Sequence, residues 1–221
     1  MAPTKLSLAV CLFPLVTPSD YQGPIELLTF LSEWSIENNL FPTELPVIID
    51  VTYLAATMDP VKGASGPLIL PTKTYADADG EQFDILLIPG GPGTRPEIIS
   101  STVLEFVKRQ STGAKYVLSV CTGSEILAAS GVVNGFRATT NKWDYKRIST
   151  TYKDVAWVPK ARWVVDGKFW TSSGVTAGSN MAYAFVKHLA GHEIAEVARG
   201  VVELGLHDQE DDEFATIHGL V

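Results

Sequence analysis

The sequence predicts an α/β fold, a three-layer α/β/α sandwich around a mainly parallel central sheet. Short apolar runs rich in β-branched residues alternate with longer stretches of helical character, which is typical of a parallel sheet covered on both faces. A chain of 221 residues, 46% hydrophobic and 19% charged, can form one compact core. We therefore expect a single domain over residues 1–221.

Five apolar runs are expected to form the strands of the sheet. Each run is bounded by Gly, Pro or Asp, which interrupt strands. The runs are residues 6–13, 47–54, 83–88, 115–120 and 162–171. Ligands of open α/β sheets bind beyond the carboxyl ends of the strands, so the corners that follow these runs are the expected places for chemistry.

The helices are expected between and after these strands. Gly191 separates the last two because glycine commonly ends a helix. The acidic run HDQEDDE begins the last segment, residues 207–221, which is expected to be a solvated tail. The predicted helices cover residues 23–38, 96–109, 122–131, 141–151, 177–190 and 192–205.

The charge and the apolar pattern exclude some classes of partner. A formal net charge of −8 gives no basic field for nucleic acid or for an anionic membrane surface, so a small-molecule ligand is expected. The apolar stretch at 6–16 is strand-sized, and no membrane anchor is expected. Cys11 and Cys121 are the only cysteines, which suggests no disulfide framework and a cytoplasmic protein.

Cys121 is the strongest candidate for a reactive residue. The segment KYVLSVCTGSEILAASG, residues 115–131, predicts a buried strand that ends at Cys121 and turns into a helix at Thr122 and Gly123. This arrangement is a nucleophile elbow, and the helix N-terminus is expected to lower the pKa of the sulfur and favour the thiolate. The alternative is that Cys121 is a small core residue, as Cys11 in LAVCLF is expected to be.

The glycine-rich corner IPGGPG, residues 88–93, follows the third strand. It is not expected to bind a nucleotide, since no GK[ST] follows and Arg95-Pro96 interrupts the helix start. The backbone N–H groups of Gly90 and Gly91 are unhindered and are predicted to donate to an anion that develops near Cys121. A tight turn without a ligand is the alternative.

Asp20 follows the first strand, just before Gly23-Pro24 and a predicted helix. It could be an ordinary helix N-cap. However, the first and fourth strands should open on the same edge of the sheet, so Asp20 and Cys121 can converge, and a carboxyl group beside a thiolate can shuttle protons. Glu26 is the competing carboxylate and is expected to support the helix.

The four histidines lie late in the chain, at 188, 192, 207 and 218, so a Cys-His-Asp triad is not indicated locally. His188 and His192 have the i,i+4 spacing of metal ligands. Gly191 should break the helix between them, and no further Cys or acidic ligand accompanies them. We therefore predict no metal site.

Taken together, the corners resemble the ThiJ/PfpI superfamily of flavodoxin-like α/β proteins, from about residue 5 to about residue 205. The resemblance rests on the segments IPGG, SVCTG, GVVNGFRATTNKW and SSGVTAGSNMA in this order. Within the superfamily the chain looks most like the isonitrile hydratase branch, in which an Asp before Gly-Pro partners a Cys-Thr elbow. Here these residues are Asp20, Cys121 and Thr122.

The resemblance implies a hydro-lyase that adds water to an organic isonitrile and gives an N-substituted formamide. Cys121 would be the nucleophile, Asp20 the proton shuttle and Thr122 the third catalytic residue. The backbone N–H of Thr122 would join those of Gly90 and Gly91 as a donor to the developing charge. The implied reaction needs no metal or organic cofactor. Relatives are usually homodimers.

Two departures from the superfamily pattern concern the pocket. Relatives commonly read ATTHW where this chain has ATTNKW, so Asn141 and an inserted Lys142 replace a histidine, and Asn180 stands where an acidic residue is common. Asn141 and Trp143 are tentative pocket residues, although for Trp143 packing as a helix anchor is slightly favoured.

Two other functions stay open. One is glyoxalase or deglycase chemistry on a 2-oxoaldehyde. Branches with protease-like or glyoxalase-like activity usually carry a His directly after the nucleophile, where this chain has Thr122. The other is a cysteine-oxidation sensor without catalysis, because an accessible low-pKa thiolate oxidises readily.

Overall fold

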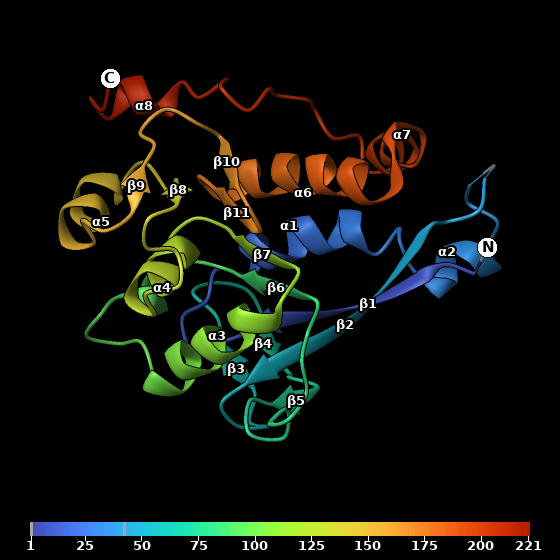
Figure 1. Ribbon diagram of the computed structural model, residues 1–221, viewed down its shortest axis with the longest axis horizontal. Coiled ribbons are helices and arrows are strands. Elements are labelled where there is room, and N and C mark those ends of the chain that lie inside the picture. The colour runs from blue at the N-terminus through green and yellow to red at the C-terminus, as the bar shows by residue number, and fades with distance from the viewer. Residues whose placement is uncertain (1, 42) are drawn as a thin grey trace.

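The computed structural model describes residues 2–41 and 43–221. In this part of the chain the main sheet has seven strands in the order β10-β11-β7-β6-β1-β2-β5 (Figure 1). All neighbouring pairs are parallel except β10 and β11. The strands are β1 (Thr4–Cys11), β2 (Val47–Ala55), β5 (Lys73–Thr74), β6 (Ile85–Ile88), β7 (Tyr116–Ser119), β10 (Trp163–Asp166) and β11 (Phe169–Ser172).

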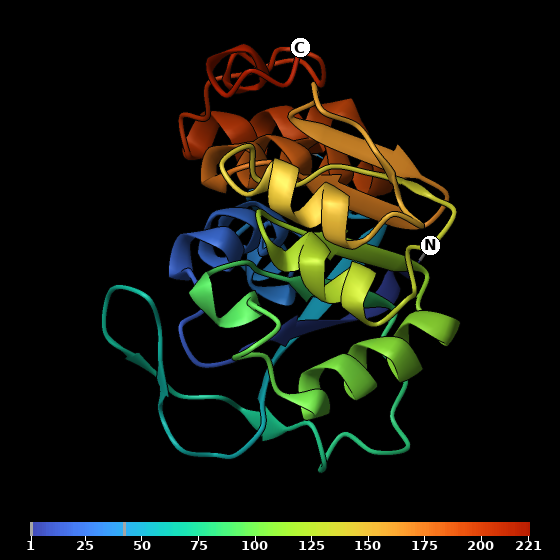
Figure 2. The same cartoon turned by 90° about the vertical axis from the view of Figure 1, so that its left-hand side faces the viewer.

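Helices cover both faces of this sheet. The helices α1 and α6 pack against each other on one face, and α3 and α4 lie on the other (Figures 1 and 2). The central strand β6 reads ILLI, and all four of its residues are buried because both faces are covered. The covering helices are α1 (Pro18–Leu28), α3 (Ser101–Gly113), α4 (Gly123–Ala129) and α6 (Val175–Ala190).

The remaining helices and two small two-stranded ladders lie outside the main sheet and its covering helices. None of the helices in the described part of the chain is both long and apolar enough to cross a membrane. The remaining helices are α2 (Glu33–Glu37), the 3-10 helix η1 (Pro92–Thr94), α5 (Tyr145–Thr151), α7 (His192–Val201) and α8 (Phe214–Ile217). Two small ladders pair β3 (Val61–Lys62) with β4 (Leu68–Ile69), and β8 (Arg137–Ala138) with β9 (Ala156–Trp157).

The predicted α/β sandwich with a mainly parallel sheet is confirmed, and the first four predicted strands correspond to β1, β2, β6 and β7. The fifth prediction is wrong in detail. Residues 162–171 form the antiparallel pair β10 and β11, and the turn between them contains Gly167 at φ +56°. A left-handed backbone at this position suits glycine, which has no Cβ to clash.

The first predicted helix, residues 23–38, is also wrong at both ends. α1 begins at Pro18, because proline suits the first turn of a helix, and it ends at Leu28 before the separate short helix α2. Asp20 is therefore not an N-cap but lies within the first turn of α1. This position turns its side chain toward the interior, where it is completely buried.

The C-terminal segment, residues 207–221, is not simply a solvated tail. Most of its acidic side chains are exposed, but Asp212 is buried and forms an ion pair with Lys142 at 3.2 Å. The backbone N–H of Arg162 donates to the carbonyl of Gln209 at 2.7 Å. The segment crosses above α6 and returns to the end of the molecule that holds α5 and β9 (Figure 1).

Candidate active site

Cys121 forms the predicted elbow between β7 and α4. Its φ of +57° is unusual for a residue with a side chain. The surrounding structure holds this conformation on both sides: the Cys121 N–H donates to the carbonyl of Ser173 at 2.8 Å. Its carbonyl accepts from the hydroxyls of Ser124 and Thr140, each at 3.1 Å. A strained backbone that is fixed this firmly is characteristic of functional sites.

Asp20 lies at the same edge of the sheet, beyond the end of β1. One carboxylate oxygen, Oδ2, accepts from the N–H of Gly90 at 3.0 Å. The other oxygen, Oδ1, is buried and has no hydrogen-bond partner among the described residues. Burial raises the pKa of Asp20 to about 7, although hydrogen bonds from Gly90 and from the Cys121 thiol oppose the shift. The predicted convergence of Asp20 and Cys121 is therefore present in the structure.

The expected low pKa of Cys121 is wrong. Burial, and after it the charge of Asp20, raises the pKa of the thiol to about 12. The N–H of Thr122 and the side chain of Asn141 act in the opposite direction but do not outweigh burial. At neutral pH the resting pair therefore carries the proton on the Cys121 sulfur, beside the Asp20 carboxyl group.

The backbone N–H groups of the glycine-rich corner bind neighbouring site residues and are not free to donate to an anion. The N–H of Gly90 is bonded to Asp20, and the N–H of Gly91 donates to Thr122 Oγ1 at 2.9 Å. The Thr122 hydroxyl in turn donates to the carbonyl of Gly91 at 3.3 Å. The predicted anion donors Gly90 and Gly91 are thus engaged with the two other predicted catalytic residues. Thr122 faces the sulfur with its N–H, while its hydroxyl fixes the corner.

We expect Gly90→Ala to inactivate the protein. A Cβ at this position would lie 2.6 Å from Thr122 N, 2.7 Å from Thr122 Oγ1 and 2.9 Å from Asp20 Oδ2, so the pair could not keep its geometry. Overpacking of this kind costs about 1–3 kcal/mol of stability. Catalytic turnover by the variant would be measured, and its free energy of unfolding would be determined by urea denaturation. The matched control is Gly200→Ala in α7, where a Cβ meets nothing within 4 Å. Wild-type activity in Gly90→Ala would contradict the expectation.

Asn141 contacts the nucleophile directly. Its Nδ2 donates to Cys121 Sγ at 3.2 Å, while its Oδ1 accepts from the N–H of Trp143 at 2.8 Å and that of Asp144 at 3.3 Å. The two backbone donors fix the orientation of the amide, so the NH₂ group faces the sulfur. Asn141 can therefore stabilise negative charge on the sulfur when the thiol loses its proton.

Trp143 does not pack as a helix anchor, because 79% of its surface is exposed. Together with Asn141 it lines a pocket of about 230 Å³, and the role of both residues in binding a substrate stays a prediction. Asn180 has a different place. Its Oδ1 accepts from Arg162 Nη2 at 2.7 Å and its Nδ2 donates to the carbonyl of Gly205 at 3.0 Å, so it connects elements behind the pocket.

Sequence analysis missed a buried ion pair beside the elbow. Glu125 in the first turn of α4 is completely buried, and both of its oxygens accept from Arg147 of α5, at 2.6 and 2.8 Å. Arg147 Nε also donates to Asp144 at 3.1 Å. The pair fixes α5 against α4 and so holds the segment that carries Asn141. An acidic residue four positions after the nucleophile, in CTGSE, was the only local signal.

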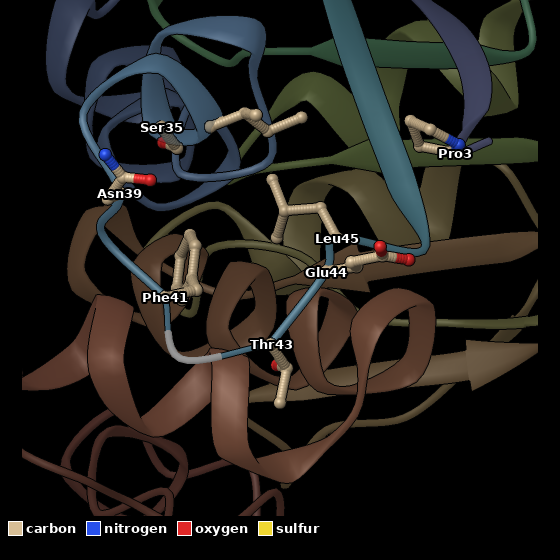
Figure 3. A pocket seen from close by; sticks show the side chains of 8 residues that line it. Pro3, Ser35, Asn39, Phe41, Thr43, Glu44 and Leu45 are labelled. Carbon is tan, nitrogen blue, oxygen red and sulfur yellow. The ribbon is translucent and has the colours of Figure 1, made fainter. Parts of the chain in front are cut away.

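The pocket shown in Figure 3 lies elsewhere. It has a volume of about 430 Å³ and is lined by residues that include Pro3, Phe41 and Leu45. Pro3 and Leu45 precede β1 and β2, so this pocket is at the amino-terminal edge of the sheet. Cys121 follows the carboxyl end of β7, and the two sites are therefore separate.

Comparisons with known proteins agree on one family. The model of the DJ-1/PfpI family matches residues 10–188. Isonitrile hydratase from Pseudomonas putida is 32% identical over 194 residues, which are 88% of this chain and 76% of that protein. A glutathione-independent glyoxalase from Caenorhabditis elegans is 33% identical over 85 residues, 38% of this chain and 46% of that protein. The curated relatives thus include enzymes.

Solved structures that resemble this chain include proteins of the same family. A ThiJ/PfpI family protein from Pseudomonas syringae has a TM-score of 0.76 at 26% identity, covering 93% of this chain and 78% of that one. DJ-1beta from Drosophila melanogaster has a TM-score of 0.73 at 22% identity, covering 91% of this chain and all of that one (100%). The second likeness supports the fold.

Proposed function

The chain belongs to the DJ-1/PfpI family, and from this premise we propose that it is an isonitrile hydratase, which adds water to an organic isonitrile and releases an N-substituted formamide. The observation that carries the proposal is the buried Asp20 and Cys121 pair, in which Asp20 Oδ1 has no partner among the described residues. The similarity to isonitrile hydratase over most of both chains supports it.

The first step adds the Cys121 thiol across the terminal carbon of the isonitrile. Asp20 takes the proton from sulfur, and the thiolate then forms an S–C bond while Asp20 delivers the same proton to that carbon. The product is a thioimidate, R–N=CH–S–Cys121. The Thr122 N–H and Asn141 Nδ2 stabilise the charge on sulfur while the proton is on Asp20.

The second step returns the free enzyme. Asp20 Oδ1 accepts a proton from a water molecule as the water oxygen attacks the thioimidate carbon, and Asp20 then passes this proton to the nitrogen. As the C–S bond breaks, Asp20 moves the proton of the new hydroxyl group to the departing sulfur, and the formamide R–NH–CHO leaves. Each step is an addition, an elimination or a proton transfer, so the proposed reaction requires no metal or organic cofactor. We further propose that the enzyme acts in the cytoplasm on a small molecule, as a homodimer without nucleic-acid partners.

Two alternatives have specific observations against them. Several relatives are named as a glyoxalase or as deglycases, but each of them matches a smaller part of this chain than isonitrile hydratase does. An oxidation sensor needs an accessible thiolate, whereas Cys121 is 8% exposed and its pKa is raised.

The test is a pair of assays on the purified wild-type chain. With cyclohexyl isonitrile we expect stoichiometric release of N-cyclohexylformamide, measured by chromatography and mass spectrometry. With methylglyoxal we expect no lactate above the uncatalysed rate. Lactate without formamide would replace the proposal by the glyoxalase function. The absence of both products would refute both enzymatic functions.

A further inference from the structure

The pocket of about 230 Å³ near Cys121 is lined by three segments that are far apart in the sequence. Asn141 lines this pocket and also donates to Cys121 Sγ, so its side chain connects the pocket to the nucleophile. One segment is the Asn141–Trp143 turn, the second runs from the residues after β11 to the start of α6, and the third is the C-terminal segment. The full lining is Asn141, Lys142, Trp143, Ser173, Gly174, Val175, Thr176, Phe214 and His218.

Large apolar side chains surround this pocket without being covered. Trp143 is 79% exposed, Phe214 is 44% exposed and Val175 is 37% exposed. His218 contacts Trp143 edge-on, with 5.9 Å between the ring centroids, so the C-terminal segment and the Asn141–Trp143 turn meet there. An apolar group in the pocket would remove these surfaces from water, which favours its binding by about 25 cal/mol per Å².

A buried ion pair holds the C-terminal segment in this place. Lys142 Nζ lies 3.2 Å from Asp212 Oδ2, and each of the two side chains is only 2% exposed. Lys142 also donates to the carbonyl of Ala161 at 3.0 Å, and the N–H of Ala161 donates to Asp212 at 3.1 Å. Removal of one charge of this ion pair would leave the other buried without its partner.

The ion pair also connects the wall to the nucleophile. Lys142 stands between Asn141, which contacts the sulfur, and Trp143, which lines the pocket. Asp212 stands two residues before Phe214. One contact therefore positions residues on both sides of the pocket entrance. Lys142 is the residue inserted relative to the superfamily pattern ATTHW, and this contact gives it a role.

We propose that the C-terminal segment, residues 207–221, completes the substrate pocket, that Phe214 and Trp143 select isonitriles with a bulky apolar substituent, and that the Lys142–Asp212 ion pair positions this wall. The proposal rests on the proposed function. It adds a specificity determinant that lies outside the part of the chain that the family model matches, residues 10–188.

The first experiment compares Phe214→Ala and Trp143→Ala with cyclohexyl and methyl isonitrile as substrates. We expect kcat/KM for cyclohexyl isonitrile to fall about tenfold, mainly through KM, because the lost contact area amounts to about one to two kcal/mol. For methyl isonitrile we expect a change below about threefold. Equal losses for both substrates, or no loss for either, would overturn the selective wall.

The matched control is Ile217→Ala. Ile217 is on the same helix α8, is 65% exposed and does not line the pocket. It should leave both substrates unaffected. A loss of cyclohexyl isonitrile turnover in this variant equal to that of Phe214→Ala would show a general effect of the segment and would contradict a role for the Phe214 side chain.

The second experiment tests the ion pair with Asp212→Asn, with the exposed Asp208→Asn as control. Asp212→Asn should raise KM for cyclohexyl isonitrile and increase hydrogen exchange in residues 207–221. The double variant Lys142→Met with Asp212→Leu removes both buried charges and should restore KM, since an apolar pair can replace a buried ion pair. Wild-type KM and exchange in Asp212→Asn would overturn the positioning role.

A binding measurement separates failure of the wall from failure of the proposed reaction. N-cyclohexylformamide and N-methylformamide would be titrated into wild-type protein and Phe214→Ala by calorimetry. Preferential binding of the cyclohexyl compound that depends on Phe214 supports the wall even if no isonitrile is turned over. Turnover of isonitriles with no dependence of binding on Phe214 leaves the hydratase standing and refutes the wall.

Discussion

Cys121→Ala should abolish formamide release, with a fall in kcat/KM of at least about 10⁴-fold, because the proposed reaction passes through a bond to this sulfur. Acid quenching of the wild-type enzyme during turnover should trap a species heavier than the free protein by the mass of one isonitrile. Intact-mass spectrometry would detect this thioimidate, and the alanine variant should show none.

Cys11→Ala is the matched control for the loss of a thiol. Cys11 is completely buried in β1, and burial raises the pKa of its thiol to about 12. The variant should keep wild-type turnover and the trapped adduct, and it should lose about 1 kcal/mol of stability for the deleted buried atom. Full activity in Cys121→Ala, or an adduct on Cys11, would contradict the assignment of the nucleophile.

The order of the elements could be predicted because the strands are short apolar runs bounded by turn residues. The run 83–88 became β6 and the run 115–120 became β7 with small changes at their ends. The run 162–171 is the exception. Its turn residue, Gly167, lies among apolar residues that belong to both strands of the antiparallel pair, so periodicity alone did not reveal two strands.

The convergence of Asp20 with Cys121 could also be predicted, because parallel strands place their carboxyl ends at one edge. The protonation state of Asp20 and Cys121 could not be predicted from the sequence. It depends on the balance between burial and a few hydrogen bonds, and burial prevails for both side chains. Likewise, the sequence shows that Gly90 and Gly91 have unhindered N–H groups, but not that Asp20 and Thr122 already accept from them.

The pocket wall depends on contacts between segments that are far apart in the chain. Asn141 is a candidate pocket residue because it departs from the superfamily pattern. Trp143 is a candidate because it directly follows this departure. Asp212 lies in a run of charged residues, and a run of this kind usually forms a solvated surface. Its contacts with Lys142 and with the N–H of Ala161 distinguish Asp212 from its neighbours, and no local pattern indicates either partner.

Asp20→Asn should lower kcat/KM by about 10³-fold or more, because the amide cannot accept the proton of Cys121. The wild-type pH profile should show the same dependence. Since the pKa of Asp20 is raised to about 7, the carboxyl group is protonated and inactive as a base below that pH and ionised above it. Wild-type kcat/KM should therefore rise with pH, with a midpoint near 7, and then reach a plateau. The residual activity of Asp20→Asn should lack this midpoint.

The same substitution should stabilise the folded protein at high pH. The pKa of Asp20 is raised from 3.8 to about 7 on folding, so the folded state holds the proton more tightly than the unfolded state does. The resulting destabilisation is absent below the unfolded pKa, grows between the two values, and is complete above the folded pKa, where it amounts to about 4 kcal/mol. Asparagine stays neutral, so urea denaturation should find the variant more stable than wild type at pH 8 and similar at pH 4. The exposed Asp154→Asn is the control and should show no such difference. A variant that is less stable than wild type at pH 8 would mean that the Asp20 carboxylate is well solvated, and it would remove the physical basis for its action as a base near neutral pH.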